Sequence, residues 1–312
     1  MDEKLLAGQR LILGFDGITF NNELKHIIKD LYACGIILFK RNIESPEQVK
    51  DLCRSCQSYA KEAGSPPLII CTDQEGGVVA RFKKPFTEFK GNPSIRTHED
   101  AARFARTTAE ELSGVGINMN LAPVLDWCPP EIDSIMKDRM FPGGPDEIST
   151  LGTTVINTLQ ASGMMAVAKH FPGIGRTTLD SHFQLPVLDI DLSILEKTDM
   201  VPFIRAIEND VAGIMLSHIH YPRIDETWQA SLSPVIAGKL LREKLGFQGL
   251  VFTDDLDMKA IGHDIQTCMH QILLSQIDIS LICHSGPNID AAWQQIRKLH
   301  KEDEPLRVSG EK

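Results

Sequence analysis

The chain has 312 residues, of which 42% are hydrophobic and 24% charged, a composition typical of an ordinary globular protein. Its formal net charge of −10 argues against nucleic acid as a partner, because a surface that binds phosphates needs clustered basic side chains. It contains no run of about 18 consecutive apolar residues and opens on acidic residues, so we expect neither a membrane span nor a secretory leader.

Seven cysteines are scattered along the chain, and this odd number at irregular spacing does not indicate a disulfide framework. We therefore expect a reducing, cytoplasmic setting. Cys53 and Cys56 have the spacing of a redox or zinc motif, but they fall in a helical-looking stretch without a second such pair. We interpret them as small hydrophobic residues of the core.

Short apolar runs recur along the chain, and helical-looking stretches separate them. The runs are apolar nearly throughout rather than alternating, as in strands that are buried on both faces. Ser45-Pro46-Glu47 opens one of the helical stretches with a capping residue, a proline and an early acid. The eight runs cover residues 11–15, 35–39, 68–72, 117–125, 164–169, 213–217, 250–253 and 279–283.

Eight strand–helix units in about 300 residues predict an α/β fold, a (β/α)8 TIM-type barrel. An open, doubly wound sheet is the alternative, although no Gly-x-Gly-x-x-Gly follows the first run to support a dinucleotide-binding version. No linker composition interrupts the chain, so we expect one domain over residues 1–312, with roughly the last ten residues frayed.

Polar residues follow at least six of the predicted strands. In a barrel these positions share one rim, where active sites are built. Charged groups beside buried strand ends need partners, so the sequence predicts a polar site there. The residues concerned are Asp73, Asp126, Lys169, His170, His218, His220, Asp254, Asp255 and His284.

The loop after the fifth run carries Asp180 and His182, two residues apart, so that both side chains lie on one side of an extended chain. A carboxylate beside an imidazole orients the ring and favours its charged form, which makes His182 a candidate proton donor. The alternative is a loop histidine with a structural hydrogen bond.

Two acids follow the seventh run directly. Asp254 is expected to point into the barrel mouth, whereas Asp255 is expected to point the other way and to cap a helix or pair structurally. Retaining glycosidases need a carboxylate that attacks the anomeric carbon, so Asp254 is a candidate nucleophile.

Six motifs occur in order: DQEGG (73–77), NLAPVLD (120–126), KDR (137–139), KHFPG (169–173), DSH (180–182) and TDDLDM (253–258). Together they resemble glycoside hydrolase family 3, and within it the single-domain bacterial β-N-acetylglucosaminidases, from about residue 11 to about residue 284. The resemblance implies a barrel that uses no metal or other cofactor and retains anomeric configuration through a covalent glycosyl-enzyme.

The resemblance also implies roles for individual residues. Asp254 corresponds to the nucleophile, and His182 with Asp180 corresponds to an acid/base pair in which a histidine replaces the usual second carboxylate. The implied substrate is a terminal N-acetylglucosaminide, such as a muropeptide fragment from cell-wall recycling, and we expect a monomer with no nucleic-acid or membrane partner. The sugar-binding set is Asp73, Arg139, Lys169 and His170.

The chain departs from the family pattern at Ile174, where a histidine is common, and at Val78, where an arginine is usual. Trp127 is an added sugar platform or a loop anchor. His218 and His220 could ligate a metal or simply line the rim. A β-glucosidase, a phosphorylase and a sugar-binding protein without activity therefore stay as alternatives.

Overall fold

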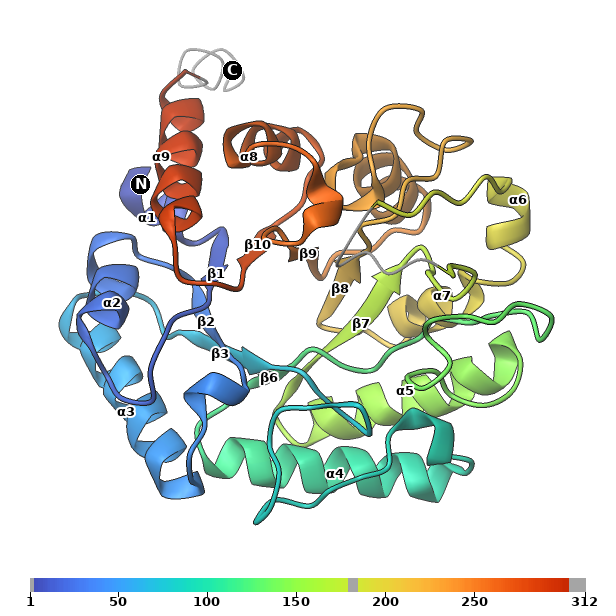
Figure 1. The fold of residues 1–312 in the computed structure, drawn as a ribbon, viewed down its shortest axis with the longest axis horizontal. Coiled ribbons are helices and arrows are strands. Elements are labelled where there is room, and N and C mark those ends of the chain that lie inside the picture. The colour runs from blue at the N-terminus through green and yellow to red at the C-terminus, as the bar shows by residue number, and fades with distance from the viewer. Residues whose placement is uncertain (1–2, 179–184, 303–312) are drawn as a thin grey trace.

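The structure is a computed structural model that describes residues 3–178 and 185–302. Eight parallel strands close into a barrel in the order β1-β10-β9-β8-β7-β6-β3-β2 (Figure 1). This confirms the predicted (β/α)8 TIM-type barrel. The strands are β1 (Leu11–Leu13), β2 (Gly35–Leu38), β3 (Ile69–Thr72), β6 (Met119–Asn120), β7 (Met165–Phe171), β8 (Gly213–Leu216), β9 (Leu250–Asp255) and β10 (Ile279–Ile282).

Helical segments follow each barrel strand and surround the barrel, while α1 precedes β1 and lies beside α9 (Figure 1). The α-helices are α1 (Glu3–Gly8), α2 (Asn22–Lys25), α3 (Pro46–Glu62), α4 (His98–Gly114), α5 (Pro145–Ala161), α6 (Leu192–Leu195), α7 (Val201–Glu208), α8 (Ile265–Leu274) and α9 (Pro287–Glu302). Two π-helical segments, η1 (His26–Asp30) and η5 (Pro234–Lys244), complete the outer layer. Shorter elements are the hairpin β4 (Gln74–Gly76) and β5 (Val79–Ala80), and the 3-10 turns η2 (Lys40–Asn42), η3 (Asn92–Ser94), η4 (Ala230–Leu232) and η6 (Lys259–Ile261).

The apolar runs form strands because both faces of each strand are buried. In β2, Ile37 belongs to the cluster inside the barrel, whereas Ile36 and Leu38 pack in the larger cluster beneath the helices. Gly213 makes room for a large ring in the interior, because a Cβ at this position would lie 2.6 Å from the Phe252 ring. Every barrel strand contributes to this interior cluster, which includes Ile12, Ile37, Cys71, Met119, Val167, Met215, Phe252 and Leu281.

The helix start predicted at Ser45 is confirmed. Ser45 caps α3, since its side chain accepts a hydrogen bond from the backbone N–H of Gln48 at 3.1 Å and Pro46 occupies the first turn. Ser233 caps η5 in the same way. These two capping residues mark where α3 and η5 begin.

The fourth predicted strand, 117–125, is shorter than expected. Its ladder is confined to Met119–Asn120, and Pro123 has no N–H to donate. The segment nevertheless continues beside β7, where the backbone N–H of Leu125 donates to the carbonyl of Lys169 at 2.8 Å. This pairing brings the following residue, Asp126, next to His170.

Candidate active site

A cavity of about 260 Å³ lies at the carboxyl ends of the barrel strands, directly above interior side chains that include Ile37, Met215 and Leu281. Its volume is just below the range of about 300–1,000 Å³ that is usual for ligand sites, which suits one sugar ring better than a longer chain. The cavity brings together five of the predicted site residues, Asp73, Arg139, Lys169, His170 and Asp254.

Lys169 lies at the centre of the polar network, between two carboxylates. Its Nζ lies 2.7 Å from Oδ1 of Asp73 and 2.7 Å from Oε1 of Glu75. The other oxygen of Asp73 accepts a hydrogen bond from Nη2 of Arg81 at 2.9 Å. Lys169 comes from β7 and Asp73 follows β3, so these contacts link strand ends that β6 separates.

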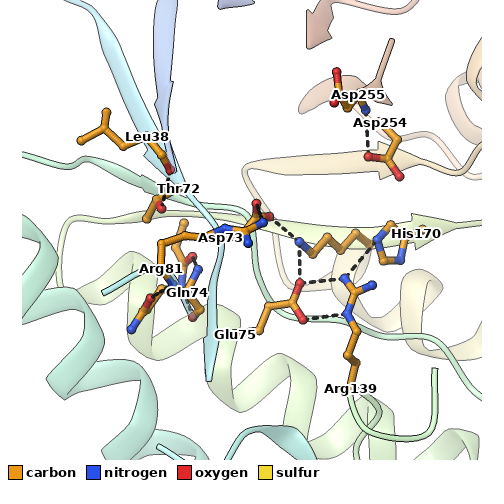
Figure 2. A network of polar contacts seen from close by, with 12 residues as sticks. Leu38, Thr72, Asp73, Gln74, Glu75, Arg81, Arg139, His170, Asp254 and Asp255 are labelled. Atoms are coloured by element: carbon orange, nitrogen blue, oxygen red, sulfur yellow. Dashed lines mark hydrogen bonds and ion pairs between the residues drawn. The ribbon is translucent and has the colours of Figure 1, made fainter. Parts of the chain in front are cut away.

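Arg139 holds Glu75 through two parallel bonds. Its Nε lies 3.0 Å from Oε2 and its Nη2 lies 2.8 Å from Oε1 of the same carboxylate (Figure 2). Two parallel bonds fix the plane of the guanidinium relative to the plane of the carboxylate, which a lysine in place of Arg139 would not do. The arginine reaches the rim from the loop between β6 and α5.

Opposite charges keep this network ionised despite its burial. Burial raises the pKa of Asp73 and Glu75, but the positive charge of Lys169 outweighs it, with Arg81 helping at Asp73 and Arg139 at Glu75, so that both pKa values lie below their ordinary range. Burial lowers the pKa of Lys169, yet the two carboxylates more than offset this and raise it. The cavity therefore presents fixed charges, which can donate to and accept from sugar hydroxyls in defined directions.

His170 is oriented by a buried carboxylate. Its Nδ1 lies 2.7 Å from Oδ2 of Asp126, and the same carboxylate accepts the backbone N–H of Ile174 at 2.9 Å. Because a carboxylate accepts only, Nδ1 carries the proton and Nε2 is left to face the cavity, 3.5 Å from Nη2 of Arg139. Asp126 thus sets the tautomer of one predicted sugar-binding residue.

Asp254 is the second-last residue of β9 and lines the cavity, as the sequence predicted. Its Oδ1 accepts the backbone N–H of Asp255 at 2.8 Å (Figure 2). Burial raises the pKa of Asp254, but favourable electrostatic interactions with His218 and with other neighbouring polar groups outweigh it, and the pKa lies below its ordinary value. The carboxylate is therefore charged at neutral pH, as a nucleophile must be.

His218 bonds to the backbone at the end of β9. Its Nε2 donates to the carbonyl of Asp255 at 2.8 Å, and its Nδ1 pairs with Oγ of Ser231 at 2.6 Å. Burial lowers the pKa of His218, so the ring is neutral at pH 7 and Nδ1 accepts from the serine hydroxyl. Nε2 of His220 donates to the backbone carbonyl oxygen of Asp225 at 3.1 Å. His218 is thus held through both ring nitrogens and His220 through Nε2.

The remaining predictions have mixed outcomes. Asp255 points away from Asp254, as expected, and pairs locally instead of capping α8, whose cap is Asp264 (Figure 2). The proposed acid/base residues Asp180 and His182 lie outside the described residues. Trp127 packs against the Arg176 guanidinium, 5.2 Å from the ring centroid, which favours the loop-anchor interpretation.

The two departures from the family pattern occupy different environments. Ile174 is buried and lines the cavity, where an apolar side chain takes the place of a polar one. Val78 is 67% exposed at the tip of the β4–β5 hairpin. The nearby Arg81 makes the contact with Asp73.

Sequence reasoning assigned no role to Glu75 or Arg81, although both line the cavity. The available signal for Glu75 was its position two residues after Asp73, at the end of a buried strand. For Arg81 there was no local signal, because its contact with Asp73 depends on the turn of the β4–β5 hairpin.

Six of the seven cysteines are buried in the core, and Cys128 is half-buried. All seven are free thiols, and Cys53 and Cys56 are buried on the inner face of α3. Burial raises the pKa of both thiols to about 12, so neither is a thiolate at neutral pH. Among the helices that the structure describes, none combines the length and the apolar character that crossing a membrane requires.

The closed barrel and the charged, sugar-sized cavity at its rim together define a TIM-barrel enzyme. More particularly, the chain belongs to glycosyl hydrolase family 3, since the profile of the "Glycosyl hydrolase family 3 N terminal domain" matches residues 3–309. It is accordingly a glycoside hydrolase.

Similar proteins agree with this assignment. A protein named Beta-hexosaminidase from Nitrosomonas eutropha is 34% identical over 293 residues, which cover 90% of this chain and 82% of the relative. A family 3 β-N-acetylglucosaminidase from a Paenibacillus species superimposes with a TM-score of 0.93 at 32% identity, over 97% of this chain and 59% of that protein. NagZ from Neisseria gonorrhoeae, solved in complex with N-trifluoroacetyl-D-glucosamine, gives a TM-score of 0.80 at 26% identity, over 96% of this chain and 95% of that protein.

Proposed function

We propose that the protein is a retaining exo-β-N-acetylglucosaminidase that releases terminal N-acetylglucosamine. The observation that carries this proposal is the position of Asp254, a charged carboxylate that shares one small cavity with the Asp73–Lys169–Glu75–Arg139 network. A nucleophile on one side and fixed hydroxyl partners on the other are what an exo-acting glycosidase requires. The names of the similar proteins support the N-acetyl sugar.

In the proposed first step, Asp254 attacks the anomeric carbon and forms a covalent ester with the sugar. The bond to the leaving oxygen breaks with its electron pair, and His182, oriented by Asp180, transfers its proton to that oxygen. In the second step neutral His182 takes a proton from water, whose oxygen attacks the anomeric carbon. Asp254 leaves as a free carboxylate, and the configuration is retained.

The polar network supplies the binding energy for this reaction. Asp73 accepts from sugar hydroxyls, while Lys169, Arg139 and the Nε2 of His170 complete the donor and acceptor set. These groups are already held by one another, so little reorganisation is needed when the sugar binds.

We further propose that the natural substrate is a muropeptide fragment and that residues 1–312 act as one catalytic domain, as a monomer, in the cytoplasm. Support for the compartment comes from the free thiols, which suit a reducing setting. The likeness to NagZ, solved with N-trifluoroacetyl-D-glucosamine, and to the Beta-hexosaminidases supports an N-acylated amino sugar at the cleaved end of that substrate.

A panel of aryl glycosides, assayed with and without phosphate, tests the proposal. We expect turnover of aryl β-N-acetylglucosaminide, no increase in rate with phosphate, and free N-acetylglucosamine as the product. A preference for the aryl glucoside would indicate a β-glucosidase, and sugar 1-phosphate would indicate a phosphorylase. Sugar binding without turnover of any substrate would indicate a binding protein.

A further inference from the structure

A cluster of metal-ligating side chains lies at the edge of the sugar cavity, which Asp255 also lines. Asp255 ends β9, Asp257 lies in the turn that follows, and His284 comes directly after Cys283 at the end of β10. We propose that Asp255, Asp257 and His284 form a binding site for a divalent transition-metal ion of the zinc class. This inference does not rest on the proposed function.

The three donor atoms already converge. Nδ1 of His284 lies 3.5 Å from Oδ2 of Asp257 and 3.7 Å from Oδ2 of Asp255, and the ligand atoms of all three residues lie within 4.8 Å of one another. A tetrahedral zinc ion with ligand distances of about 2.0–2.2 Å separates its ligands by about 3.3–3.6 Å. Shifts of about an ångström would therefore be enough to close the three ligands around an ion.

Bonds from the surrounding chain orient both carboxylates. Oδ1 of Asp255 accepts the backbone N–H groups of Asp257 at 3.0 Å and of Cys283 at 3.1 Å, which turns Oδ2 toward the imidazole. Oδ1 of Asp257 accepts from Nδ2 of Asn288 at 2.9 Å, on the first turn of α9. Outer contacts of this kind are what hold ligating carboxylates in place at metal sites.

The charges of the cluster favour a cation. Asp255 and Asp257 bring two carboxylates together beside one imidazole. The side chain that faces both acids is His284, which is 66% exposed and is cationic only when protonated. An exposed pair of this kind contributes little, whereas a divalent ion would offset both negative charges at neutral pH.

The donor set selects the kind of ion. One imidazole and two carboxylates suit zinc and its neighbours, whereas calcium and magnesium prefer oxygen ligands throughout. Three protein ligands leave a further position for water. An ion here would join the turn after β9 to the end of β10 and, through Asn288, to α9, so that binding is expected to stabilise the fold.

Thermal unfolding of the full chain, freed of metal with a chelator, tests the site. Zinc at about a hundredfold over its dissociation constant is expected to raise the Tm by about 4 °C, while calcium and magnesium leave it unchanged. The His284→Ala variant should lose this rise. His270→Ala, which removes an exposed histidine on α8, is the matched control and should keep it.

Zinc could also bind in the sugar cavity, so the titration is repeated with Asp254→Asn. The rise should persist in this variant and disappear again when His284→Ala is added. Absence of a rise in the parent chain, or an equal rise in His284→Ala, would overturn the proposal. Because the readout is stability, turnover of aryl N-acetylglucosaminide is measured separately and its failure would bear on the proposed function alone.

Discussion

The Nζ atom of Lys169 lies 2.7 Å from the Oδ1 atom of Asp73, so that a buried ion pair spans the barrel mouth between the ends of β7 and β3. Glu75 binds the same ammonium group, and Arg139 binds Glu75 in turn. Each charged group in this network is compensated by its neighbours, and the network depends on the lysine at its centre.

Replacing Lys169 with methionine should therefore destabilise the protein as well as disable it. Two buried carboxylates would lose their shared partner, which costs about 3–5 kcal/mol in the free energy of unfolding. Urea denaturation measures this loss. Lys137→Met, at an exposed pair with Asp133, is the control and should leave stability nearly unchanged. Equal stability of both variants would show that the network does not support the fold.

Asp254→Gly should lower turnover of aryl β-N-acetylglucosaminide by a factor on the order of 10³ or more, since the covalent step is lost. Added azide should restore turnover in this variant and yield the α-glycosyl azide, because the small anion attacks the anomeric carbon from the vacated side. Asp264→Asn, in which asparagine replaces aspartate as the cap of α8, is the control and should keep normal turnover. Normal turnover by Asp254→Gly would remove the nucleophile assignment.

His182→Ala should slow substrates with poor leaving groups by about 10²–10⁴-fold, because the departing oxygen must then leave without a proton. A strongly activated aryl leaving group needs little protonation, so its release in a single turnover should be far less affected. Comparing the two substrates in His182→Ala and in the exposed control His270→Ala measures the effect. Equal losses for both leaving groups would contradict the role of proton donor.

We propose that charge explains why a histidine would serve as the acid in place of a carboxylate. A histidine is neutral after it has given up its proton, and it then repels an incoming anion or the N-acetyl carbonyl less than a carboxylate would. His182→Glu should therefore lose activity and become more sensitive to the charge of the acceptor. Full activity with unchanged anion sensitivity in this variant would refute the explanation.

The stability of Asp255→Asn should depend on pH in a direction set by burial. Burial and the neighbouring Asp257 raise the pKa of Asp255 above its ordinary value, so the folded state holds its proton more tightly than the unfolded state. The charged carboxylate therefore costs stability once pH exceeds the unfolded pKa, and the full cost is reached above the folded pKa. In urea denaturation without metal, the free energy of unfolding of the variant should increase relative to that of the parent as pH rises from 4 to 7. A relative stability of the variant that decreases over this pH interval would contradict the prediction.

Arg139→Lys tests the fork to Glu75. A lysine keeps the charge but cannot make the two parallel bonds, so Glu75 and the substrate would lose a fixed orientation. We expect kcat/KM to fall by about 10–100-fold with a smaller change in stability. Activity equal to that of the parent would show that charge alone suffices at this position.

The sequence by itself determined the barrel, because its signals are local. Runs of apolar residues such as 213–217 specify strands buried on both faces, and Ser45 with Pro46 marks a helix start within four residues. Strand-end positions then placed Asp73, Lys169 and Asp254 at one rim without any knowledge of their contacts.

Only the tertiary structure decided which charged side chains form pairs. Glu75 pairs with Arg139, 64 residues away, and Asp126 orients His170 because β6 closes against β7. The convergence of Asp255 and His284 likewise depends on the neighbouring positions of β9 and β10. Such contacts arise from the order in which strands close the barrel, and periodicity along the chain carries no information about partners that lie across it.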